Sequence, residues 1–148
     1  MHDQFEQLLA SEVATIEAFL TCFEGATTAQ AGLSPSRGAL WIQGFPLPAH
    51  YKPDSICLLL DVSHFPIEPP KGMYLLTNAT NRTLVEQLKK RFNVFQNLAF
   101  HGAQGVEGYE WLCFGYLDGW RYNIRQPNKG DNIAKMLISF WRMLEEKK

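Results

Sequence analysis

The spacing of apolar residues changes near Arg37, and this change constrains the fold more than any other feature of the 148-residue chain. Residues 3–24 place apolar side chains three and four positions apart, which predicts an amphipathic helix that stops at Gly25. Beyond Arg37 the apolar runs are short and are divided by Gly and Pro, as is typical of strands. A helix followed by consecutive strands predicts an α+β fold with an antiparallel meander.

Three strands are expected, at residues 39–42, 55–62 and 73–77. Residues 56–60 are apolar at every position, which predicts a central strand covered on both faces. On this interpretation Cys57 is a small core residue.

Two further helices are expected after the strands. Residues 81–95 carry apolar side chains at helical spacing, with cations on the other side. Residues 101–130 contain six glycines and little periodicity, so we expect a long irregular loop with a functional role. Asp131 is predicted to cap a final helix that runs toward the C-terminus.

Length and charge narrow the functional classes. The chain has the size of one ordinary domain, 1–148, and 46% apolar residues. Its 14 basic and 15 acidic residues give a net charge of -1, which does not favour binding to nucleic acid or to an anionic membrane. The expected partner is a protein or a neutral ligand. The start lacks the features of a secretory signal, and no run approaches about 18 apolar residues, so a cytoplasmic location is expected.

The three cysteines differ in their sequence surroundings. Cys22, Cys57 and Cys113 are widely spaced with no C-x-x-C pair, which argues against disulfides and against a metal site. Cys22 and Cys57 fall in apolar segments and are expected to be hidden and inert. Cys113 follows a glycine-rich run, where a thiol could be accessible, and is the candidate nucleophile.

Four features around Cys113 have an order that resembles the ubiquitin-conjugating enzyme family. Residues 64–70, His-Phe-Pro-Ile-Glu-Pro-Pro, look like the family's aromatic-Pro-x-x-Pro-Pro segment. His101 lies twelve residues before Cys113, close to the spacing from the family's His-Pro-Asn motif to its cysteine. Residues 111–114 resemble the apolar flanks of that cysteine, and Trp120 lies seven residues after it. The resemblance covers nearly the entire chain.

The resemblance implies a single UBC-like domain with an N-terminal helix, a β-meander, an active-site loop and one C-terminal helix, shortened because the family's last helices are lacking. It implies a cysteine acyltransferase that receives a ubiquitin-like protein from an activating enzyme as a Cys113 thioester and passes it to an amine of a target protein. No cofactor and no metal are implied. The shortened form looks like the conjugating enzymes of bacterial ubiquitin-like operons associated with antiphage defence.

The chain departs from the family pattern where Gly102 and Ala103 follow His101, because the Pro and the Asn of the motif are absent. The oxyanion donor would then come from glycine backbone N–H groups, from Tyr116 or from His101. His101 has either an active-site role or a structural one. Asp118 is the candidate proton acceptor or amine-positioning residue, the alternative being a solvated loop carboxylate.

The first 36 residues contain five acids and no Lys or Arg, so the exposed face of the first helix is negative. A solvated face and a docking face for a basic partner both fit this pattern. Six residues are candidate contacts with the activating enzyme or the ubiquitin-like protein: Glu6, Glu12, Phe65, Ile67, Tyr116 and Trp120.

Three other functions remain open on sequence grounds. The first is a non-catalytic UBC-like binding module or scaffold, which would usually lack the cysteine. The second is a cysteine hydrolase using Cys113, His101 and Asp118, although their separations do not resemble known protease layouts. The third is a nucleotide-binding loop, but no Lys-Ser or Lys-Thr pair follows the glycines.

Overall fold

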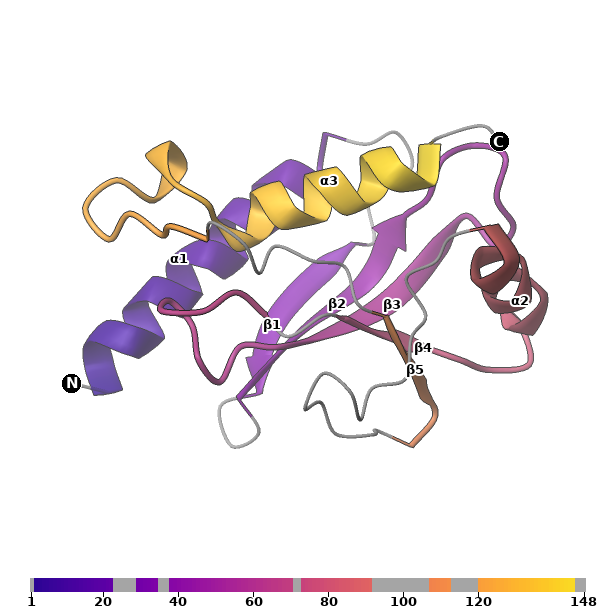
Figure 1. Cartoon of the computed structure of the whole chain (residues 1–148), viewed down its shortest axis with the longest axis horizontal. Coiled ribbons are helices and arrows are strands. Elements are labelled where there is room, and N and C mark those ends of the chain that lie inside the picture. Colours follow the sequence, from indigo (N-terminus) through magenta and orange to yellow (C-terminus); the bar gives the residue numbers. More distant parts are fainter. Residues whose placement is uncertain are drawn as a thin grey trace.

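The computed structural model describes residues 2–22, 29–34, 38–70, 73–91, 107–112 and 120–145, with only the backbone described at residues 2–5 and 112. Figure 1 shows the arrangement of the elements. In chain order they are α1 (His2–Leu20), β1 (Gln30–Ser34), β2 (Ala39–Pro46), β3 (Ser55–Asp61), β4 (Met73–Leu76), α2 (Arg82–Arg91), β5 (Tyr109–Leu112), the 3-10 helix η3 (Pro127–Lys129) and α3 (Ile133–Glu145).

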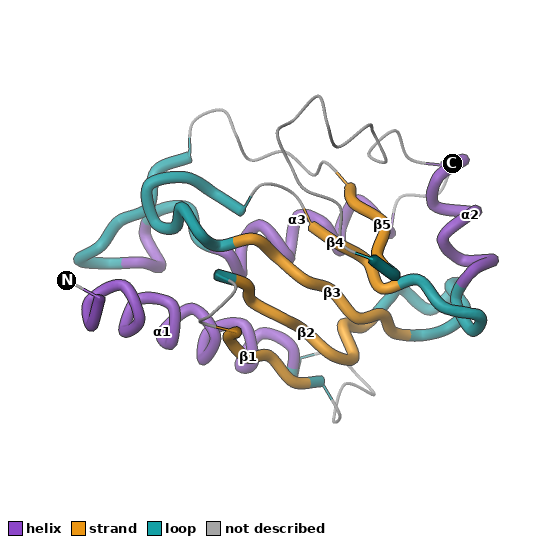
Figure 2. The backbone as a smooth tube through the Cα atoms, turned by 90° about the horizontal axis from the view of Figure 1, so that it is seen from below, coloured by secondary structure: helices purple, strands orange, loops and turns teal. Residues whose placement is uncertain are grey.

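The five strands form one antiparallel sheet in the order β1-β2-β3-β4-β5, so each strand pairs with its neighbour in sequence (Figure 2). The α+β class and the order of helix, antiparallel sheet and helix are therefore confirmed. The sequence pattern did not predict β1 and β5, because both are short edge strands without a continuous apolar run.

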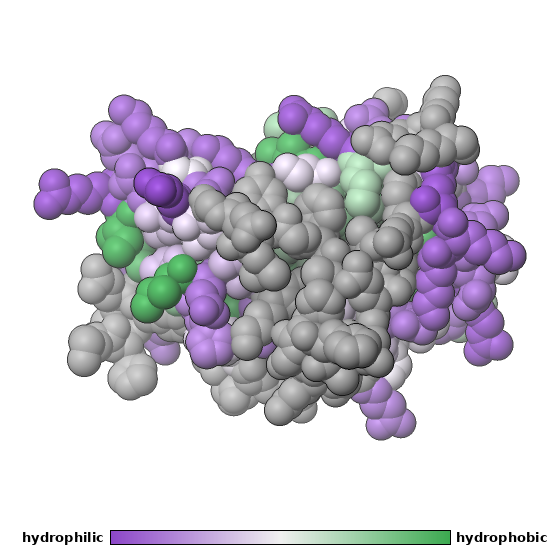
Figure 3. Space-filling view, in the orientation of Figure 1, coloured by the Kyte–Doolittle hydropathy of each residue, from purple (hydrophilic) through white to green (hydrophobic). Residues whose placement is uncertain are grey.

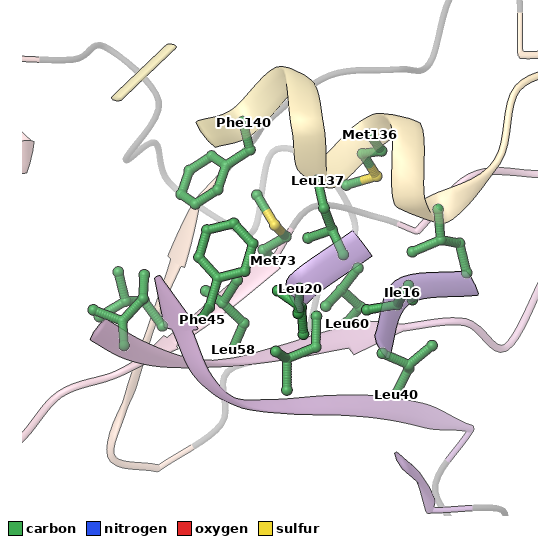
Figure 4. Close-up of a cluster of buried hydrophobic side chains, with 14 of the residues drawn as sticks. Ile16, Leu20, Leu40, Phe45, Leu58, Leu60, Met73, Met136, Leu137 and Phe140 are labelled. Carbon is green, nitrogen blue, oxygen red and sulfur yellow. The ribbon is translucent and has the colours of Figure 1, made fainter. Parts of the chain in front are cut away.

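Helices α1 and α3 lie together on one face of the sheet, and their apolar sides form the core with that face (Figures 1 and 2). Figure 4 shows Ile16 and Leu20 of α1 and Leu137 of α3 directed toward Leu40 and other strand residues. The core also contains an aromatic contact between β2 and α3, with the rings of Phe45 and Phe140 centred 5.9 Å apart. Complete burial of one such side chain stabilises the fold by about 1.5–3 kcal/mol.

The other face of the sheet carries a row of aligned residues from neighbouring strands. Trp41 lies opposite Gly32 and Leu59, and Leu59 lies opposite Tyr74. A side chain on Gly32 would collide with the Trp41 indole, because its Cβ would overlap the carbons of that ring. β3 is the central strand, as expected, and its residues alternate between buried and half-buried, so its second face is less covered than its first. Cys57 is half-buried on the less covered face, so the expectation that it is a core residue is wrong.

The helix ends differ from the predicted ones. The first helix ends at Leu20, and Cys22 in the following turn is exposed, so the expectation that Cys22 is hidden is also wrong. The final helix is capped by Asn132, whose Oδ1 accepts a hydrogen bond from the backbone N–H of Lys135 at 2.8 Å. Asp131, the predicted cap, instead accepts a bond from the backbone N–H of Arg121 at 2.7 Å.

None of the helices formed by described residues has both the length and the apolar character that a membrane crossing needs.

Candidate functional site

Two loops that are distant in sequence lie side by side at one end of the molecule. The indole N–H of Trp120 donates a hydrogen bond of 2.9 Å to the carbonyl oxygen of Pro66. The rings of Phe65 and Tyr122 meet edge to face, with their centres 4.8 Å apart. These contacts join residues 62–70 to residues 120–130, and we call this pair of segments the two-loop site.

A buried carboxylate lies beneath the two-loop site. Glu12 of α1 is 1% exposed, and its Oε1 accepts a hydrogen bond of 2.8 Å from the backbone N–H of Ile133, the first residue of α3. Burial raises the pKa of Glu12 above its ordinary value, and this bond opposes the rise. The same carboxylate therefore supplies a partner for an N–H group at the start of a helix, where such groups have no partner within the helix.

The charge of Glu12 affects the ionisation of Tyr122 in the second loop. Burial is the main reason that the pKa of Tyr122 rises to about 12, and the negative charge of Glu12 adds to the rise. Among the described residues, no group forms a hydrogen bond with the buried hydroxyl of Tyr122. The phenol consequently stays protonated at neutral pH and is not a candidate for general-base chemistry.

The second loop is closed at its base by a pair of hydrogen bonds. The N–H of Arg121 donates to the Asp131 carboxylate, and the N–H of Asp131 donates to the carbonyl oxygen of Arg121 at 2.9 Å. Gly130 is required at this closure, because a Cβ there would lie 2.5 Å from the same carbonyl oxygen of Arg121. The residues between Arg121 and Asp131 therefore project as one compact loop, in orange in Figure 1.

The surface of the two-loop site carries two aliphatic side chains in contact with solvent. Ile67 is 88% exposed and Ile124 is 53% exposed, and they are the large hydrophobic residues most exposed in the described chain. Figure 3 shows hydrophobic side chains among hydrophilic ones at this end of the molecule. The two loops that the Trp120–Pro66 bond joins therefore each present one aliphatic side chain to solvent.

The structure separates the predicted contact residues into exposed and buried groups. Glu6 and Ile67 are exposed, and Trp120 is half-buried with its N–H bonded to Pro66. Two of the predicted contact residues are buried in this chain: Glu12 is 1% exposed and bonded to the start of α3, and Phe65 is 3% exposed and packs against Tyr122. Neither side chain is available to a partner on the surface.

The predicted catalytic residues Cys113, His101 and Asp118, together with Tyr116, lie outside the described residues. The chain leading to Cys113 is described, since Cys113 follows Leu112, which ends β5 and pairs with Met73 of β4.

Sequence reasoning missed the part that residues 121–130 play in the site. Tyr122 and Ile124 were grouped with the rest of the glycine-rich segment and were not singled out. The sequence did contain one signal, because Arg121, Arg125 and Lys129 recur every four residues within a stretch that has no acid before Asp131.

The described residues contain no group of three or more His, Cys, Asp or Glu side chains that could hold a metal ion. Their other tyrosine with a raised pKa is Tyr51, which is buried and whose pKa rise is opposed by the charge of Arg91. The described part of the two-loop site thus offers no metal-binding group, while its exposed side chains can contact a ligand.

Comparisons of the chain with protein families, with curated proteins and with solved structures give no match.

Proposed function

We propose that this protein is a cytoplasmic, UBC-like cysteine acyltransferase of the ubiquitin-conjugating type, in a bacterial antiviral conjugation system. Cys113 accepts the C-terminal acyl group of a ubiquitin-like protein from an activating enzyme. An amine of a target protein then receives that group.

The hydrogen bond between Trp120 and Pro66 is the observation that supports this proposal most. It joins the two sequence features that flank the candidate nucleophile in the resemblance, the proline segment before it and the tryptophan after it. Only seven residues separate Leu112, at the end of β5, from Trp120. The helix and antiparallel meander that precede these features are compatible with the proposal.

The reaction consists of two acyl transfers. The thiolate of Cys113 attacks the thioester carbonyl on the activating enzyme, and the enzyme's cysteine leaves as a thiolate, so one thioester is exchanged for another. The target amine next attacks the Cys113 thioester, loses a proton and displaces the Cys113 thiolate, which leaves an amide. The thioester supplies much of the driving force, and orientation of the amine is the main task of the protein.

The supporting roles belong to residues near Cys113 in the sequence. Asp118 positions the amine or accepts its proton, and His101 or Tyr116 donates a hydrogen bond to the oxyanion. Loss of one oxyanion donor typically costs about 3 kcal/mol of transition-state stabilisation. Glu6 on α1 and Ile67 in the two-loop site contribute to contacts with the protein partners.

The hypothesis requires a ubiquitin-like protein and an activating enzyme, which are expected to be encoded by neighbouring genes. The test incubates these two proteins and the chain with ATP. Intact-mass spectrometry and non-reducing gels are expected to detect an adduct that a thiol reagent releases. Cys113→Ser is expected to give an adduct that resists the thiol reagent, or little adduct, and Cys113→Ala is expected to give none.

Cys22→Ser and Cys57→Ser are the matched controls, and Cys22 matters more because its thiol is exposed. Both variants are expected to load normally. Normal loading of Cys113→Ala would show that Cys113 is not the acceptor. Stable binding of the ubiquitin-like protein without any adduct would favour a non-catalytic binding module.

A further inference from the structure

The loop between Arg121 and Gly130, here named the basic loop, has a concentration of positive charge that the proposed chemistry does not use. Residues 120–135 contain four cations, Arg121, Arg125, Lys129 and Lys135, against the single carboxylate of Asp131. That carboxylate is already engaged by the backbone N–H of Arg121. The segment is therefore strongly positive within a chain whose net charge is -1.

Three of these cations surround a shallow surface depression. Arg121, Arg125 and Lys129 line a cavity of about 520 Å³ together with Tyr122 and Ile124. No carboxylate among the described residues lies within ion-pair distance of these three cations. The ion pair that the described residues do form joins Lys89 of α2 to Glu110 of β5. Within the described residues, these three charges are thus not neutralised by an ion pair.

Polar side chains within and beside the loop hold its backbone in place. Oδ1 of Asn123 accepts hydrogen bonds from the N–H groups of Arg125 and Gln126, at 3.1 and 2.9 Å. The ammonium group of Lys135 donates to the carbonyl oxygens of Asn128 and Gly130, each at 2.8 Å. A loop ordered before binding loses less conformational entropy when a ligand docks, which favours affinity.

The apolar groups at the same place indicate what kind of anion fits. Ile124 lines the depression and is exposed, and the contacts of Tyr122 with Phe65 bring the loop beside the segment that holds Ile67. A ligand that has only charge would leave these aliphatic groups in water. A peptide with carboxylates and an aliphatic side chain would satisfy both parts of the surface.

The charge around the loop disfavours a nucleic acid as ligand. The exposed acids Glu6 and Glu17 lie on α1, and the net charge of the chain is -1, so an extended polyanion that reaches beyond the basic loop would meet negative charge. A short acidic segment of a protein can occupy the depression without reaching those acids.

We propose that the basic loop binds an acidic protein segment that carries an aliphatic residue, through Arg121, Arg125, Lys129 and Ile124. This binding goes beyond the proposed acyl transfer and needs no reaction at Cys113. The loop thereby recognises a partner protein, whichever chemistry the chain performs.

The test measures binding of a fluorescent synthetic peptide in which Asp and Glu alternate around one central Leu. The double variant Arg125→Glu/Lys129→Glu is expected to weaken binding about tenfold or more, which corresponds to about 1.4 kcal/mol. The matched control is Arg82→Glu/Lys90→Glu, which reverses two exposed charges on α2 and is expected to change binding less than about twofold. Circular dichroism and thermal unfolding establish that both variants fold.

Two further probes separate the contributions of charge and of the aliphatic group. Replacement of the peptide's Leu by Gly, or of Ile124 by Ser, is expected to weaken binding severalfold, and a single-stranded oligothymidine is expected to bind more weakly than the peptide. Equal weakening by the α2 variant would overturn the proposal, because it would show attraction to charge anywhere on the surface. Tighter binding of the oligonucleotide, or no saturable binding of the peptide, would overturn it as well.

Discussion

The carboxylate of Glu12 in α1 accepts a 2.8 Å hydrogen bond from the backbone N–H of Ile133, where α3 begins. A side chain from the first helix thus satisfies the start of the last one, 121 residues later. The bond fixes the relative position of two helices that share one face of the sheet. Glu12 is accordingly a structural residue, although its position in an acidic helix suggested a docking role.

Glu12→Ala is expected to lower the free energy of unfolding by about 1–3 kcal/mol, because the N–H of Ile133 would remain buried without its partner. Glu12→Gln keeps an acceptor oxygen and removes the charge. It is expected to unfold with a free energy at neutral pH that is equal to or above that of the parent protein. Urea denaturation of both variants, with the exposed Glu6→Ala as control, measures these differences.

The raised pKa of Glu12 also predicts a pH dependence. The folded state holds the proton more tightly than the unfolded state, whose pKa is near the ordinary 4.5. The stabilising contribution is full below that value and is lost as the pH rises through the raised pKa of the folded state. Denaturation at a series of pH values from acid to neutral is expected to show this loss in the parent protein and not in Glu12→Gln. The same slope in both proteins would assign the effect to another group.

Tyr122 predicts a second loss of stability, in the alkaline range. Its pKa rises from 10.0 to about 12 in the folded state, so its contribution is full below pH 10 and is lost between pH 10 and about 12. Tyr122→Phe removes this contribution and breaks no hydrogen bond among the described residues. It is expected to leave stability at neutral pH unchanged or raised and to reduce the alkaline loss. Tyr51, whose pKa is also raised, accounts for part of the loss that remains.

The fold class followed from the sequence because periodicity reports which side of an element faces the core. The helices ending at Leu20, Arg91 and Glu145 were all expected from spacing, and so were β2, β3 and β4. The edge strands β1 and β5 were missed. An edge strand pairs on one side only, and it forms because of the neighbouring strand more than because of an apolar pattern in its own sequence. Helix ends were less predictable. Asn132 and Asp131 are both residue types that cap helices, and Asn132 caps α3 because the Asp131 carboxylate binds the backbone of Arg121 instead.

The candidate site was predicted in part. The proline segment and Trp120 were singled out, and the structure brings them into contact through Pro66. What the sequence did not reveal is which side chains within those motifs face inward. Phe65 and Glu12 are buried because Tyr122 and α3 cover them, and such long-range packing leaves no local pattern in the sequence.

Trp120→Phe removes the hydrogen bond between the two loops and keeps an aromatic ring at position 120, so it tests the hydrogen bond by itself. The variant loses the hydrogen bond to Pro66, at a cost of about 1 kcal/mol in the free energy of unfolding. Hydrogen exchange is expected to quicken at amides of residues 120–130 and to stay unchanged in β2. If Cys113 is the acceptor, the loading rate is also expected to fall. Unchanged exchange in the loop would show that the bond does not hold the two segments together.

The two apolar residues Phe65 and Ile67 lie in the same short motif and are expected to respond to substitution in opposite ways. Phe65 is 3% exposed and packs against Tyr122, so Phe65→Ala is expected to lower the free energy of unfolding by about 3 kcal/mol or more. Ile67 is 88% exposed, so Ile67→Ser is expected to change it by less than about 0.5 kcal/mol.

Although Ile67→Ser is expected to have little effect on stability, it is expected to lower activity, because an exposed aliphatic side chain beside the basic loop is placed to contact a partner protein. In the loading assay with the proposed activating enzyme and ubiquitin-like protein, or in transfer to a target, Ile67→Ser is expected to slow the reaction severalfold while the protein stays fully folded. Glu68→Gln, an exposed change at the neighbouring position, is the control and is expected to react at the parent rate. A normal rate for Ile67→Ser in both steps would exclude this residue from the contacts that the two steps require.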